Sequence, residues 1–215
     1  MDEIYSTETT DRFLFLYRKL EKIAETDPER YRFYREKYYE RFEDYRHLRN
    51  YLSHEQYEGG YPFAVSSRVV ADLAAILGHM DCLAYERAAK QVVSLSPQST
   101  LQQASLVIAQ TSHTHFPILN EQGRVVGILT AGALLSLLNE GADPSLSLDG
   151  FLGRFSLRGQ KTRYLFAGRD TPLYEAERSF RIVVDGKRLS LLLLTEHGRA
   201  QESLLGILTI YDILK

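Results

Sequence analysis

The chain has 215 residues and a formal net charge of −2; 44% of the residues are hydrophobic and 25% are charged. This is the composition of an ordinary globular protein, and the balanced charge excludes a basic field over the whole protein that would attract nucleic acid by itself. The single cysteine, Cys82, excludes an internal disulfide and is typical of a reducing compartment. The polar, acidic N-terminus does not resemble a signal peptide, and no apolar run reaches the roughly 18 residues that span a bilayer. We therefore expect a cytoplasmic protein with no membrane partner.

Residues 1–86 predict a helical module, because apolar residues recur there at spacings of three and four. The first helix covers residues 8–25, with Thr9, Thr10 or Asp11 as its N-cap. A second helix begins at Asp27-Pro28 and runs to about residue 53. A third begins at Ser66 or Ser67. Helices of this length joined by short breaks favour an antiparallel bundle.

The second predicted helix carries a stripe of aromatic and leucine side chains. Its members are Tyr31, Tyr34, Tyr38, Phe42, Tyr45, Leu48 and Leu52. Their helical spacing is what packing requires, so we interpret the stripe as core or as a dimer interface. Aromatic side chains also form stacking platforms for bases, which leaves an RNA partner possible.

The same helix ends in Arg49, Asn50 and His54, in the order Arg-Asn-x-x-x-His. Histidine can act as general acid or base near neutral pH, and arginine can stabilise a developing phosphate charge. The motif resembles that of the HEPN superfamily, helical proteins that include metal-independent endoribonucleases. The resemblance implies a composite catalytic site formed by two protomers. The alternative is that these residues are only the polar end of an amphipathic helix, so the sequence leaves open whether the protein is an enzyme.

Residues 87–215 contain an internal repeat. Each copy has a turn, an amphipathic helix, a strand, a glycine turn and a second strand that ends in Gly-Ile-Leu-Thr, followed by a helix. The tetrapeptide begins at Gly127 in the first copy and at Gly206 in the second. The second copy continues to Asp212, whereas Ala133 takes that place in the first. The signature Gly-hydrophobic-x-Thr-x-x-Asp resembles that of CBS domains, the regulatory modules named after cystathionine β-synthase.

The resemblance to CBS domains implies an adenine nucleotide such as AMP, ADP or ATP as a regulatory ligand. In the second copy Gly206 would let the ligand approach the backbone, Thr209 would face phosphate at a helix N-terminus, and Asp212 would accept hydrogen bonds from ribose. Arg188 is a further phosphate candidate, and Thr130 keeps only the phosphate role in the first copy. The alternative is that Thr209 and Asp212 merely cap the last helix.

No set of side chains with metal-ligand spacing is evident, since His113 and His115 lack a third ligand. We thus predict an α+β protein with a helical bundle at 1–86, a first CBS repeat at 87–140, a connector at 141–160 and a second CBS repeat at 161–215. The connector is interpreted as flexible or as a segment that moves over the ligand site. The predicted function is adenine-nucleotide sensing by a homodimer; the alternative is a HEPN-like endoribonuclease controlled by the CBS pair.

Overall fold

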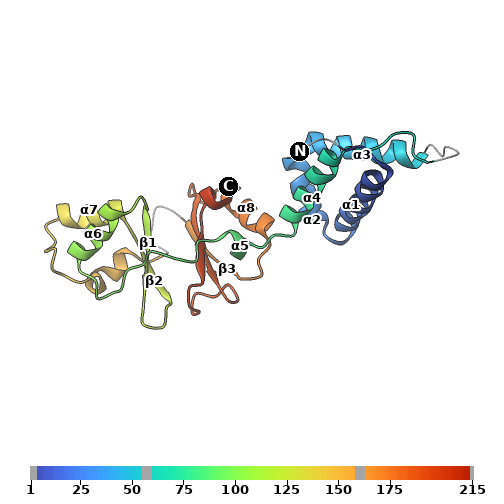
Figure 1. Cartoon of the computed structure of the whole chain (residues 1–215). Helices are drawn as coiled ribbons and strands as arrows, with labels where there is room; N and C mark the ends of the chain where they lie inside the picture. The colour runs from blue at the N-terminus through green and yellow to red at the C-terminus, as the bar shows by residue number, and fades with distance from the viewer. Residues whose placement is uncertain (1–3, 55–59, 158–162, 214–215) are drawn as a thin grey trace. The chain divides into compact units, whose positions relative to one another are not determined.

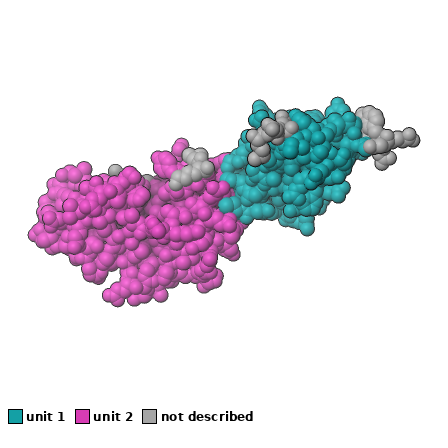
Figure 2. Space-filling view, viewed as in Figure 1, with its two compact units in different colours: residues 1–82 teal, residues 83–215 magenta. Residues whose placement is uncertain are grey.

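The computed structural model describes residues 4–54, 60–157 and 163–213. The chain divides into two compact units, residues 1–82 and residues 83–215 (Figure 1, Figure 2). Unit 1 consists of helices, and unit 2 combines helices with two small sheets. The predicted α+β class and the order of a helical module followed by two repeats are therefore confirmed.

Unit 1 is a helical bundle in which the first helix contacts all the others. Its helices are α1 (Thr7–Thr26), α2 (Pro28–Lys37), α3 (Tyr39–His54) and α4 (Ser67–Met80). Asp27 caps α2 by accepting a hydrogen bond from the backbone N–H of Arg30, with Pro28 as the first helical residue. Ser66 caps α4. The predictions for these two helix starts are confirmed.

The start of α1 differs from its prediction. Ser6 is the N-cap, and its hydroxyl accepts a hydrogen bond from the backbone N–H of Thr9 at 3.1 Å. Thr10, one of the predicted caps, is fully buried, and its hydroxyl accepts a hydrogen bond from the N–H of Val65 at 2.9 Å. That bond lies between residues 55 positions apart, so local sequence patterns could not reveal it.

The second predicted helix is broken in the middle. Tyr38 has φ −123° and ψ 40°, outside the helical region, and separates α2 from α3. The break does not interrupt the apolar stripe, since Tyr34, Phe42, Tyr45 and Leu52 are all buried in unit 1. These side chains are therefore part of the core of their own unit.

Unit 2 contains the two repeats. The first comprises α6 (Leu101–Gln110), β1 (His115–Leu119), β2 (Val125–Thr130) and α7 (Ala131–Asn139), and a short α5 (Ala84–Arg87) precedes it. The second comprises β3 (Arg163–Gly168), α8 (Leu173–Arg181), β4 (Leu189–Thr195), β5 (Gly206–Leu208) and α9 (Ile210–Ile213). The β-α-β-β-α order stands complete in the second repeat.

The first strand of the first repeat is reduced to one bridge. Leu95 pairs in parallel with Ile118 of β1, in the way that β3 pairs in parallel with β4. β1 and β2 form an antiparallel pair, as do β4 and β5. Side chains of β2 and β4 meet in one apolar cluster formed by Val125, Ile128, Leu191 and Leu193, so the two repeats share a core.

The predicted connector is not a free linker in its described part. It contains a 3-10 helix, η1 (Leu148–Arg154), and Leu148 and Phe155 are fully buried in the core of the first repeat. Arg154 forms an ion pair with Glu140 at 2.5 Å. This segment therefore completes the first repeat, and residues 158–162 lie outside the described residues.

Among the described residues, no helix combines the length and the apolar character that crossing a membrane requires.

Candidate ligand site

The two signature glycines both lie against protein backbone. A Cβ on Gly206 would come within 3.0 Å of the carbonyl oxygen of Ala89, and one on Gly127 within 3.1 Å of that of Phe155. Both distances are shorter than an ordinary carbon–oxygen contact. A side chain at either position would therefore press against a crossing segment of the chain itself, which favours glycine there.

Each crossing segment leads into one repeat and contacts the other. Ala89, ahead of α6 of the first repeat, exchanges two backbone hydrogen bonds with Ile207 of β5, at 2.9 and 3.0 Å. Phe155, before the second repeat, accepts one from Ile128 of β2 at 3.0 Å. The repeats are tied together by this exchange, and the signature strands hold their positions through it.

At the end of β5 the structure brings Thr209 and Asp212 together. The Asp212 carboxylate accepts hydrogen bonds from the backbone N–H of Thr209 at 2.9 Å and from its hydroxyl at 2.7 Å. The capping role considered in the sequence analysis is therefore what the structure shows. An ionised carboxylate has about four acceptor positions, so capping and ligand binding are compatible at this residue.

The first repeat uses its threonine differently. The Thr130 hydroxyl accepts a hydrogen bond from the N–H of Ala133 at 3.1 Å and so caps α7. Opposite Thr130 in the β1–β2 ladder stands His115, whose ring lies 6.0 Å from that of Tyr164 in the second repeat. Partial burial lowers the pKa of His115 below its ordinary value.

The ladders also show which residues of the two repeats correspond. Gly127 pairs with Ile118 and Gly206 pairs with Leu194, so Leu191 takes the place of His115. Arg188 comes three residues before Leu191, which corresponds to about 10 Å along the strand. Arg188 lies directly before β4, and its backbone is therefore about three residues away from the position opposite Thr209.

A cavity of about 370 Å³ lies on the α8 side of the second repeat. Its walls include Leu165 and Leu192 from the sheet, and its polar groups are Thr171, Glu175, Ser179 and His197. None of the predicted ligand residues lines it. The cavity and the end of β5 are thus two separate places in the second repeat.

Sequence reasoning missed this cavity, although a signal for it exists. Thr171, Glu175 and Ser179 follow one another at intervals of four, which places them on one face at and along α8. His197 enters from the turn after β4, where Glu202 accepts hydrogen bonds from its backbone N–H at 2.7 Å and shares one with its Nδ1 at 2.8 Å. The first of these bonds is the main reason why the pKa of Glu202 falls to about 2.

The Arg-Asn-x-x-x-His motif lies at the end of α3. Arg49 donates a hydrogen bond to Asn50 Oδ1 at 3.4 Å and forms an ion pair with Glu21 of α1 at 3.2 Å. His54 is the last residue of the helix, and its side chain lies outside the described part. Arg46 is paired with Glu43. The positive charges of Arg46 and Arg49 are therefore both balanced by acidic side chains.

No group of three or more His, Cys, Asp or Glu side chains that could hold a metal ion occurs among the described residues.

A family model for the CBS domain matches residues 86–140. The chain therefore contains a CBS domain. The match covers the first repeat, and the second repeat adds the same order of elements. No curated protein matches the sequence.

Several solved structures are similar to the chain. A CBS domain protein from Streptococcus pneumoniae is 16% identical, with 66% of this chain and 88% of that chain covered and a TM-score of 0.46. A conserved domain of unknown function from Neisseria meningitidis is 18% identical, with coverages of 68% and 86% and a TM-score of 0.49. A CBS domain pair in complex with 5-methylthioadenosine and S-adenosyl-L-methionine is 18% identical, with coverages of 62% and 93% and a TM-score of 0.43. Similarity at this level carries no conclusion about the ligands of this chain.

Proposed function

We propose that unit 2 is a regulatory module that binds an adenine nucleotide or a related adenosine compound at one dominant site, at the end of β5. The observation that carries the proposal is the position of Asp212, whose carboxylate stands in the first turn of α9 directly after the Gly-Ile-Leu-Thr strand. In this proposal the carboxylate accepts hydrogen bonds from the ribose hydroxyls.

The difference between the repeats supports a single dominant site. Ala133 occupies the position of Asp212 in the first repeat and offers no side-chain acceptor. Thr130 keeps its capping role there and contributes at most a weak phosphate contact. We therefore expect one ligand for each chain.

Unit 1 is the proposed effector or dimerisation module, and the protein is proposed to act as a homodimer. Its charged helices expose Tyr39 and Tyr51 at 58% and 61%, so aromatic surface is available to a partner even though most of the stripe is buried. A mass measurement that finds only a 24.7 kDa species at micromolar concentration would refute the dimer.

The ligand proposal is tested by calorimetry with AMP, ADP and ATP on the full chain. Asp212→Ala is expected to weaken binding by about 1–3 kcal/mol, the cost of lost hydrogen bonds to buried hydroxyls. The same titration with 2′-deoxy-AMP removes one hydroxyl from the ligand instead. If Asp212 holds the ribose, the two changes are not additive, because each removes the same contact.

Two controls separate this contact from indirect effects. Asp185→Ala removes an exposed carboxylate on another turn and should leave binding unchanged. Ser179→Leu partly fills the α8 cavity, so a loss of binding there would place the ligand in the cavity and not at Asp212. No binding of any adenine compound to the folded wild-type chain would overturn the proposal.

The alternative endoribonuclease function has weaker support. Arg46 and Arg49 are paired with Glu43 and Glu21, whereas a ribonuclease site needs basic groups available to a phosphate. We therefore rank the non-enzymatic sensor first.

A further inference from the structure

A hairpin at residues 181–188 exposes three consecutive aliphatic side chains. Ile182, Val183 and Val184 are 45%, 51% and 41% exposed. They follow α8 and precede β4, so they lie outside the regular elements of the second repeat. Exposed apolar side chains in a row mark an interaction surface more often than isolated ones do.

The hairpin is a formed structure. Val184 and Lys187 exchange backbone hydrogen bonds at 3.1 and 2.9 Å, and the turn between them has Asp185 and Gly186 at φ 51° and 72°. Two positive φ values at Asp-Gly are typical of a type I′ turn, which closes a tight hairpin. The aliphatic side chains are therefore presented at a defined tip.

Arg163 of β3 anchors both arms of the hairpin. Its backbone N–H donates to the carbonyl of Arg188, and its Nη1 donates to the carbonyl of Ile182, each at 3.1 Å. The hairpin is thus hydrogen-bonded to the edge strand of the three-stranded sheet.

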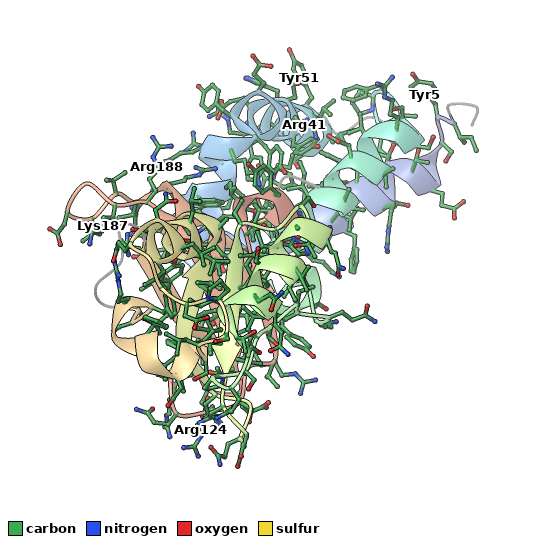
Figure 3. All side chains as sticks on the ribbon, turned by 90° about the vertical axis from the view of Figure 1, so that its left-hand side faces the viewer. Tyr5, Arg41, Tyr51, Arg124, Lys187 and Arg188 are labelled. Atoms are coloured by element: carbon green, nitrogen blue, oxygen red, sulfur yellow. The ribbon has the colours of Figure 1, made fainter. Side chains whose placement is uncertain are left out.

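Basic residues flank the aliphatic tip. Residues 178–188 contain four basic residues and one acidic residue, Asp185, in a chain whose net charge is −2. Lys187 and Arg188 lie on the second arm, in the loop that projects at the side of the ribbon in Figure 3. Apolar side chains with a basic rim suit the boundary between the anionic headgroups and the acyl chains of a lipid surface.

We infer that the 181–188 hairpin docks unit 2 on an anionic lipid surface, with Ile182, Val183 and Val184 entering the headgroup boundary and the basic rim attracting the headgroups. The contact is peripheral and involves no membrane span, and it departs from the expectation of no membrane partner. A nucleic acid would meet the same charges but would offer the aliphatic tip no aliphatic surface.

The test is co-sedimentation of the full chain with vesicles of phosphatidylcholine alone and of phosphatidylcholine with about 30 mol % phosphatidylserine. Binding is expected only to the second kind and should weaken at high salt. Arg188→Glu and Val183→Ser are each expected to weaken it by about tenfold. Matched controls are Arg124→Glu, on the β1–β2 turn, and Leu106→Ser, an exposed apolar position on α6; both should bind as the wild type does.

Three results would overturn the inference. The first is equal binding, or none, to the two kinds of vesicle. The second is an equal loss in Arg124→Glu and Arg188→Glu, which would indicate general charge attraction. The third is binding to soluble heparin that matches the vesicle affinity and does not change in Val183→Ser, which would indicate a soluble polyanion. Circular dichroism on each variant checks that an altered fold is not the cause.

Discussion

Gly206 lies against the carbonyl oxygen of Ala89, so closely that a Cβ at this position would stand 3.0 Å from it. The neighbour is backbone in a segment held by two hydrogen bonds to Ile207, so it cannot give way as a flexible side chain can. The signature glycine therefore serves the joining of the two repeats.

Gly206→Ala is expected to lower the free energy of unfolding by about 1–3 kcal/mol, the usual cost of overpacking a tight contact. Gly132→Ala is the matched control, because Gly132 lies inside α7 with nothing within 4 Å of its added Cβ. Alanine there should raise the free energy of unfolding by up to about 1 kcal/mol. Urea unfolding measures the free energy of unfolding of both variants. Equal changes in the two would mean that the contact with Ala89 does not restrict position 206.

Phe155→Ala should destabilise unit 2 by about 3–5 kcal/mol, since it empties a fully buried position in the core of the first repeat. Leu146→Ala, in the same predicted connector but 49% exposed, should change little. Thermal unfolding of the two variants compares them. A small effect of Phe155→Ala would mean that the segment is only a linker.

The stability of the protein should depend on the protonation of His115. Burial lowers the pKa of its ring in the folded protein, whereas the unfolded chain has a value of about 6.5. The unfolded state therefore binds the proton more tightly. The contribution of neutral His115 to the free energy of unfolding is complete above the pKa of the unfolded chain, and it is lost as the pH falls below that value.

Urea unfolding at pH values between about 7.5 and 5 measures this dependence. His115→Leu introduces the residue found at the corresponding position 191. In this variant the free energy of unfolding should decrease less at low pH than in the wild type. His113→Gln, at an exposed position, should leave it as in the wild type. If His115→Leu keeps the full pH dependence, another group is responsible.

Tyr45→Phe is expected to cost about 1–3 kcal/mol in unit 1. The Tyr45 hydroxyl donates to Asp72 Oδ2 at 2.5 Å, and Asp72 also pairs with Arg41 at 2.8 Å, so the variant loses a hydrogen bond to a charged group. Burial, with the Asp72 hydrogen bond, also raises the pKa of Tyr45. Tyr51→Phe, at an exposed position, is the control, and denaturant unfolding followed by circular dichroism separates the two.

Purified protein is expected to leave single-stranded RNA intact, with and without adenine nucleotides, because Arg49 is paired with Glu21. Gel electrophoresis of labelled RNA without divalent metal provides the measurement. Cleavage that yields 2′,3′-cyclic phosphate ends and disappears in His54→Ala would contradict this expectation and establish the endoribonuclease. Cleavage that persists in His54→Ala would indicate a contaminant.

The sequence by itself determined the helical module, the repeat and the CBS signature. These features depend on patterns that extend over only a few residues. Examples are the helix start at Asp27-Pro28 and the tetrapeptides that begin at Gly127 and Gly206. The hydrogen bonds between Thr209 and Asp212 also follow from the sequence, because the two residues are three positions apart and capping requires that spacing.

Tertiary structure alone decided the contacts between residues that are far apart in the sequence. Ala89 meets Gly206 across more than a hundred residues, Glu21 reaches Arg49 from another helix, and Phe155 is buried in the repeat that precedes it. Such contacts depend on how whole elements pack, and a local pattern does not encode the partner of a given side chain. For that reason the close approach of Gly206 to the backbone of Ala89 could not be predicted from the sequence.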